Sequence, residues 1–126
     1  MDALRQREPR ICNAQHLKDV RDLACLVCGD DTGSDPAHLR YTAGPEKQNP
    51  GAAQKPHDYY VVPLCRRHHD EQHHFKFGER EWWRKQGIDP LPIAEQLWEA
   101  RGDFTEMWAI IRGFHRKYDS MAETPF

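Results

Sequence analysis

The chain has 126 residues, of which 38% are hydrophobic and 30% are charged, with a formal net charge of -2 and a mean hydropathy of -0.92. This length suits one domain with an appended arm, and the low apolar content predicts a small core of the kind that a bound metal often stabilises. No apolar run is long enough to span a membrane, and residues 1–10 lack the apolar stretch of a signal peptide. We therefore expect a cytoplasmic protein without a membrane partner, in which closely paired cysteines indicate metal binding or redox chemistry.

The N-terminal part predicts an arm, a helix and a cysteine knuckle. Residues 1–11 are charged and are expected to form a loose arm. Apolar residues recur at helical spacing over 16–24, which predicts a short amphipathic helix. This helix leads into Cys25 and Cys28, and the following Gly29 permits the tight turn that brings backbone amides close to the cysteine sulfurs.

Two short strands are expected next. Residues 37–42 alternate between apolar and polar side chains, and residues 59–62 read Tyr-Tyr-Val-Val, which has a high strand propensity. Pro63 is expected to end the second strand. Residues 43–57, rich in glycine and proline, predict a long connecting loop, and such loops in small domains are often functional.

The rest of the chain is predicted to be helical. One helix is expected over 64–74 and a second over 79–86, ended by Gly87. A third is expected to begin at Pro92, and a last one to be capped by Asp103. The tryptophans lie at helical spacing and are interpreted as core residues, with an interaction surface as the alternative: Trp82, Trp83, Trp98 and Trp108.

Four residues form two pairs with the spacing of zinc ligands. Cys25 and Cys28 are separated by two residues, and so are Cys65 and His68. Thiolates and imidazole are the ligands that zinc prefers, and four of them close a structural site to water. The alternative is a redox Cys25/Cys28 pair with a buried apolar Cys65, but a thioredoxin-type motif belongs in a βαβ context that the sequence does not predict. The remaining cysteine, Cys12, is expected to be buried.

Three further histidines indicate a second, open site. His69 and His73 are four positions apart on the predicted 64–74 helix, so their side chains rise from one face about 5–6 Å apart at Cβ. Two imidazoles leave coordination positions for water and substrate. His38 has the type of side chain that serves as a general base near neutral pH. The alternatives are solvated helix histidines and an ordinary polar strand residue.

Charge gives a weaker indication. Between Arg40 and Lys85 there are nine Lys and Arg against six Asp and Glu, although the whole chain is acidic. A local positive excess is compatible with a surface that faces phosphates. Ordinary solvated charge explains the same numbers.

The combined pattern resembles the HNH endonucleases, which have the ββα-metal fold, and within them the small phage and prophage HNH proteins. The resemblance rests on Cys-x2-Cys, a strand bearing His38, a loop, and then the Val-Pro-Leu-Cys-x2-His-His motif of residues 62–69. It covers roughly residues 10 to 102. It implies an α+β protein with a zinc-stapled ββα-metal core (12–78), an N-terminal helix and a C-terminal helical extension (79–126) packed on that core.

The resemblance also implies roles for single residues. His38 would be the general base, and His69 and His73 would hold one catalytic divalent ion, such as Mg²⁺, Mn²⁺, Ni²⁺ or Zn²⁺. The family usually has an asparagine shortly before the Leu-Cys, and Asp58 is the nearest polar residue here. The family often places a metal ligand directly before the base, where this chain has Ala37, and the substitute candidate is Asp35.

The activity that the resemblance implies is hydrolysis of DNA phosphodiester bonds in a bacterium or a phage-infected host. DNA would be the partner, held through its phosphate backbone. The candidate phosphate contacts are Arg40, Lys55, Arg66 and Arg67. The rival interpretation is a zinc module that recruits DNA or protein without catalysis. Both a monomer and a homodimer are compatible with the sequence.

Overall fold

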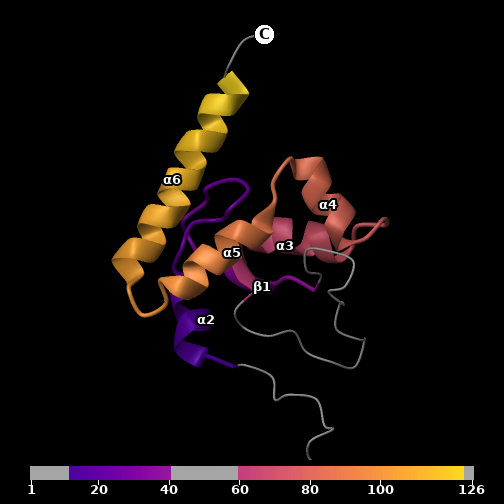
Figure 1. Ribbon diagram of the computed structural model, residues 1–126. Helices are drawn as coiled ribbons and strands as arrows, with labels where there is room; N and C mark the ends of the chain where they lie inside the picture. Colours follow the sequence, from indigo (N-terminus) through magenta and orange to yellow (C-terminus); the bar gives the residue numbers. More distant parts are fainter. Residues whose placement is uncertain (1–11, 41–59, 124–126) are drawn as a thin grey trace, which may run out of the picture.

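A computed structural model describes residues 12–40 and 60–123, with side chains described as far as Tyr118. These residues form five helices and one two-stranded sheet, so the α+β class is confirmed (Figure 1). The predicted arm, the 43–57 loop, Lys55 and Asp58 lie outside the described residues. The elements in chain order are α2 (Ala14–Arg21), β1 (Asp35–His38), β2 (Val61–Leu64), α3 (Arg66–His73), α4 (Glu79–Gln86), α5 (Pro90–Glu99) and α6 (Phe104–Glu123).

The sheet corrects the predicted position of both strands. β1 and β2 are antiparallel, with Pro36 opposite Pro63, so the expectation that Pro63 ends the second strand is wrong. The Leu39 amide donates to the Tyr60 carbonyl at 2.8 Å, and hydrogen-bonded pairs alternate along an antiparallel ladder. The two prolines therefore face each other as a non-hydrogen-bonded pair, where a missing N–H breaks no ladder bond.

Helix ends follow local capping chemistry. α4 ends at Gly87, whose φ of 72° is left-handed, as predicted. The prediction that α5 begins at Pro92 is wrong by two residues, because Asp89 accepts the Leu91 amide at 3.2 Å and Pro90 occupies the first helical position. Asp103 accepts the Glu106 amide at 3.1 Å, which confirms it as the cap of α6.

The core lies between the sheet and the helices that cover it. α2 and α5 contact the strands, and α6 packs along α5. Trp82 and Trp83 are each 1% exposed and belong to this core as expected, whereas Trp98 and Trp108 are only partly buried. Cys12 is exposed, so its predicted burial is wrong.

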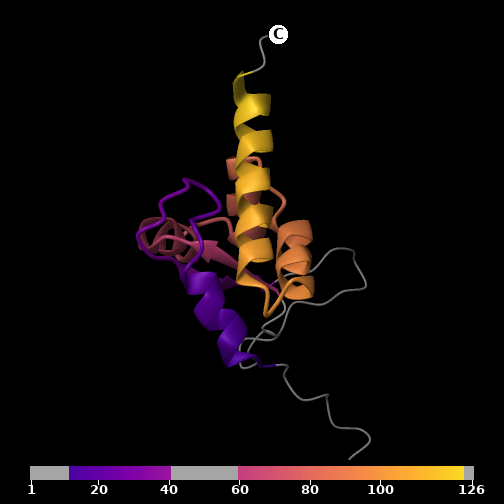
Figure 2. The ribbon, with the colours of Figure 1, turned by 90° about the vertical axis from the view of Figure 1, so that its left-hand side faces the viewer.

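The long helix α6 extends beyond the other elements, as Figure 2 shows. Two side chains attach it to distant parts of the chain. His115 Nε2 lies 3.1 Å from the Leu26 carbonyl in the cysteine knuckle, and the Tyr118 hydroxyl donates to the Gln86 carbonyl at 2.9 Å. Among the described residues, no helix is long and apolar enough to cross a bilayer.

Candidate metal centre and adjoining histidine pocket

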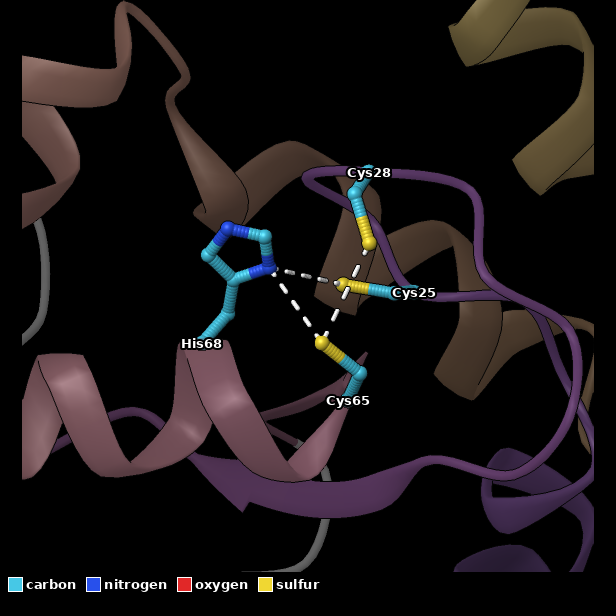
Figure 3. Close-up of side chains that lie close together, drawn as sticks. All are labelled: Cys25, Cys28, Cys65 and His68. Carbon is cyan, nitrogen blue, oxygen red and sulfur yellow. Dashed lines mark hydrogen bonds between the residues drawn. The ribbon is translucent and has the colours of Figure 1, made fainter.

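Three cysteines and one histidine meet between the knuckle and the start of α3 (Figure 3). Cys25 and Cys28 come from the turn after α2, Cys65 is the residue that caps α3, and His68 lies in the first turn of that helix. One ligand atom from each lies within 4.8 Å of all the others. Cys25, Cys65 and His68 are buried and Cys28 is exposed. The predicted grouping of these four residues is confirmed, and the cluster is able to bind a metal ion.

The distances within the cluster fit a tetrahedral ion. Sulfur and nitrogen ligands at zinc distances of about 2.3 and 2.0 Å would be separated by about 3.8 Å between two sulfurs and about 3.5 Å between sulfur and nitrogen. Cys28 Sγ and Cys65 Sγ are 3.9 Å apart. His68 Nδ1 lies 3.8 Å from Cys25 Sγ and 3.3 Å from Cys65 Sγ. These three separations are close to those of a tetrahedral zinc site.

The knuckle turn aims backbone groups inward. Gly29 has a φ of 78°, and its amide donates to the Cys25 carbonyl at 2.9 Å. Burial raises the pKa of the Cys25 thiol to about 11, opposed by hydrogen bonds from the backbone amides of Cys65, Cys28 and Val27. A bound cation reverses such a shift, because it stabilises the thiolate. Burial, and then the charge of Arg67, lowers the pKa of His68, which favours the neutral imidazole that metals bind.

A separate pocket of about 270 Å³ opens on the other side of α3. It is lined by the three remaining predicted histidines, together with Arg40 and Gln72 among others: His38, His69 and His73. His38 ends β1, while the rings of His69 and His73 lie one turn apart on α3 with centroids separated by 4.9 Å. Burial, and next the neighbouring His69, lowers the pKa of His73.

Asp35 contacts one of these histidines directly. Its Oδ2 lies 2.9 Å from His69 Nδ1, and Arg66 pairs with the same oxygen at 2.8 Å. A hydrogen bond to Nδ1 fixes the ring and leaves Nε2 as the nitrogen that faces a metal or substrate. Within the described parts of the chain, no second group of three Cys, His, Asp or Glu ligand atoms is as close as the Cys₃His cluster. The interpretation of Asp35 as a direct ligand stays a prediction, and its geometry favours an orienting role.

The other predicted phosphate contacts lie at the surface. Arg66 is 70% exposed and Arg67 is 69% exposed, and each also pairs with an acidic residue one turn further along α3. Arg40 is exposed and lines the pocket. Lys55 and Asp58 fall outside the described residues.

Glu79 is a pocket residue that the sequence reasoning did not single out. Both of its carboxylate oxygens accept the Arg40 amide, at 3.1 and 3.4 Å, and the Gln72 side chain also hydrogen-bonds to it. Burial raises the pKa of Glu79 to about 7, against the opposing effects of Arg40 and Gln72. Glu79 thus joins the end of β1 to α3 and α4. Its sequence signal, an acidic residue in the first turn of a helix, also marks ordinary helix starts.

Comparison with protein families identifies the class of this chain. Residues 3–101 match the family model described as "Protein of unknown function (DUF968)", and the chain belongs to that family. Comparisons with curated proteins and with solved structures gave no match.

Proposed function

We propose that this protein is a metal-dependent DNA endonuclease or nickase with a separate structural zinc. One observation carries the proposal: His38 from β1 and His69 and His73 from α3 line the same pocket, next to a complete Cys₃His ligand set. A histidine that is able to accept a proton, opposite two that are able to hold a cation, is an arrangement suited to metal-assisted hydrolysis.

The order of elements supports the same proposal. Two antiparallel strands lead directly into α3, and the cysteine knuckle precedes them. This is the order of a ββα-metal core, to which we assign residues 12–78. We assign zinc to the Cys₃His cluster because its ligand types and separations suit that ion.

In the proposed mechanism, the chain's own residues position the phosphate and move one proton. A divalent ion held by His69 and His73 would supply a Lewis acid for the phosphate and the leaving 3′ oxygen. Asp35 holds His69 through Nδ1, so that Nε2 points away from the carboxylate. Arg40 provides a positive charge at the pocket for the phosphate. His38 accepts a proton from the attacking water, a role worth about 10²- to 10⁴-fold in rate.

A plasmid-nicking assay with added Mg²⁺, Mn²⁺, Ni²⁺ or Zn²⁺ tests this proposal. We expect His38→Ala to lower the nicking rate by about 10²- to 10⁴-fold, because it removes the general base. The matched control is His74→Ala, which removes an exposed histidine at the end of the same helix. Zinc content and thermal midpoint should equal those of the wild type in both variants. Absence of metal-dependent cleavage, or a His38→Ala rate equal to that of the wild type, would refute the catalytic proposal.

The second candidate function is a zinc module that binds DNA or protein without cleaving it. One observation favours it. Among the described residues, no third Cys, His, Asp or Glu ligand atom lies as close to His69 and His73 as the four ligand atoms of the Cys₃His cluster lie to one another. The same assay separates the two candidates. A non-catalytic module would leave the plasmid supercoiled with every metal, and gel-shift experiments would then distinguish a DNA-binding module from a protein-binding one.

A further inference from the structure

The turn between α3 and α4, residues 74–78, presents a phenylalanine to solvent. The Gly78 amide donates to the Phe75 carbonyl at 3.2 Å, which closes a turn with Lys76 and Phe77 at its two corners. Phe77 is 69% exposed and is the one large hydrophobic residue of the described chain that stands out in this way. Phe77 therefore lies exposed at a corner of a hydrogen-bonded turn.

A lysine side chain lies near each of the two aromatic rings of this turn. The rings of Phe75 and Phe77 meet edge to face, with centroids 5.8 Å apart. Lys76 Nζ lies 5.7 Å from the Phe77 ring, and Lys85 Nζ lies 5.5 Å from the Phe75 ring. The exposed Phe77 ring, with lysine side chains beside it and beside the partly buried Phe75, matches the two parts of a nucleotide, since bases stack on rings and phosphates pair with cations.

The turn also borders the histidine pocket. Phe75 and Gly78 both line that pocket, and Phe77 lies between them in the sequence. Figure 1 shows the connection between α3 and α4 projecting outward, on the side away from α2 and α6. A strand of DNA with its phosphate in the pocket would therefore have its neighbouring nucleotide within reach of Phe77.

We propose that Phe77 stacks on an unpaired base of the DNA substrate, with Lys76 and Lys85 contacting the adjacent phosphates. The inference rests on the proposed nuclease function and names its substrate class: DNA that is single-stranded next to the phosphate in the pocket. An unpaired base offers a free face for stacking, whereas bases inside a duplex already stack on their neighbours. The positive charge around the ring favours this polyanion over an apolar protein partner.

Binding to fluorescent oligonucleotides without added divalent metal tests the inference independently of cleavage. The probes are a single strand and a blunt duplex that contains the same sequence. Phe77→Ala is expected to weaken single-strand binding by roughly 5- to 150-fold, the effect of losing one base–aromatic stack, and to leave duplex binding unchanged. Phe77→Trp should restore binding to the single strand.

Lysine variants supply a second arm. Lys76→Ala should reduce the salt dependence of single-strand binding by roughly one phosphate contact, because fewer counterions are released. Lys18→Ala on α2 is the matched control, since it removes an exposed lysine far from the turn. Unchanged zinc content and thermal midpoint would show that all variants fold.

Each outcome bears on one proposal. Equal binding of Phe77→Ala and wild type to the single strand overturns the inference, and so does an equal loss on single strand and duplex. Phe77-dependent binding in a protein that cleaves no DNA would support the stacking site while refuting the nuclease. Cleavage of DNA at the same rate by Phe77→Ala and wild type, with equal binding to the single strand, would support the nuclease while refuting the stacking site.

Discussion

The Cys₃His cluster and the histidine pocket share α3, but the side chains of the cluster are close together and mostly buried, whereas those of the pocket surround a cavity. The cluster has four ligand atoms within 4.8 Å and three buried members. The pocket holds two imidazoles of the same helix and a third from β1 around a cavity of about 270 Å³. Adjacent residues on an α-helix point about 100° apart, so His68 and His69 serve different sides of one helix. One short helix thus contributes to the Cys₃His cluster and to the histidine pocket through different residues.

Replacing the adjacent residues His68 and His69 one at a time is the strongest test of this comparison. His68→Ala removes the only imidazole of the Cys₃His cluster and is expected to cause loss of zinc and a large fall in thermal midpoint, because structural zinc contributes folding free energy. His69→Ala is expected to retain zinc and thermal midpoint while abolishing metal-dependent nicking. Zinc analysis, thermal unfolding and plasmid nicking on both variants make the measurement.

The reverse result would break the comparison. If His69→Ala lost zinc while His68→Ala kept it, the two histidines would have exchanged roles through a shift of one residue. Loss of zinc in both variants would mean that the two sites are not independent.

Replacement of Asp35 tests the histidine pocket alone and is expected to have a smaller effect. Asp35→Asn weakens the contact that orients His69, and such partners of metal-bound histidines are worth about 10- to 100-fold in activity or metal affinity. The comparison variant is Arg66→Ala, which removes the other partner of the same carboxylate and a candidate phosphate contact, and it should leave the dependence on metal concentration unchanged. Arg66 is 70% exposed, so its pairing contributes at most about 1 kcal/mol. Nicking rates as a function of metal concentration measure both.

A direct coordinating role for Asp35 would give a different result. Loss of activity that no metal concentration restores would identify the carboxylate as a ligand itself. An equal loss in Arg66→Ala would instead assign the effect to surface charge.

The sequence predicts the closed site better than the open one. Cys25, Cys28, Cys65 and His68 carry their own spacing signal, because a closed zinc site needs little beyond its ligands. Helix caps such as Gly87 and Asp103 are equally local and were predicted correctly. The predicted ends of the strands were wrong, because Pro63 is tolerated inside β2 only through its register opposite Pro36.

Pocket residues depend on contacts between distant segments. Glu79 bonds to Arg40, 39 positions earlier, and Asp35 meets His69, 34 positions later. Neither pair has a fixed spacing, because the separation is set by how the sheet and the helices pack together. The grouping of His38 with His69 and His73 was expected from their residue types and from the family resemblance, and not from a fixed spacing.

The last prediction concerns the pH dependence of stability that Glu79, the carboxyl group between β1, α3 and α4, is expected to cause. Burial raises the pKa of Glu79 from 4.5 to about 7, so the folded protein binds more protons than the unfolded chain between these values. Its contribution to stability is therefore present below pH 4.5 and is lost as the pH rises through 7. Glu79→Gln does not titrate, and we expect its free energy of unfolding to rise relative to wild type by up to about 1.4 kcal/mol per pH unit across this window.

Denaturant unfolding of both proteins at several pH values measures that difference, and zinc-linked effects cancel in it as long as the Cys₃His cluster is intact in both. The matched control is Glu81→Gln, which removes an exposed carboxylate from the same first turn of α4. A similar pH-dependent difference in both variants would assign the effect to charge at the helix N-terminus. A difference confined to Glu79→Gln would locate the effect in the pocket, at the buried carboxyl group that hydrogen-bonds to Arg40 and Gln72.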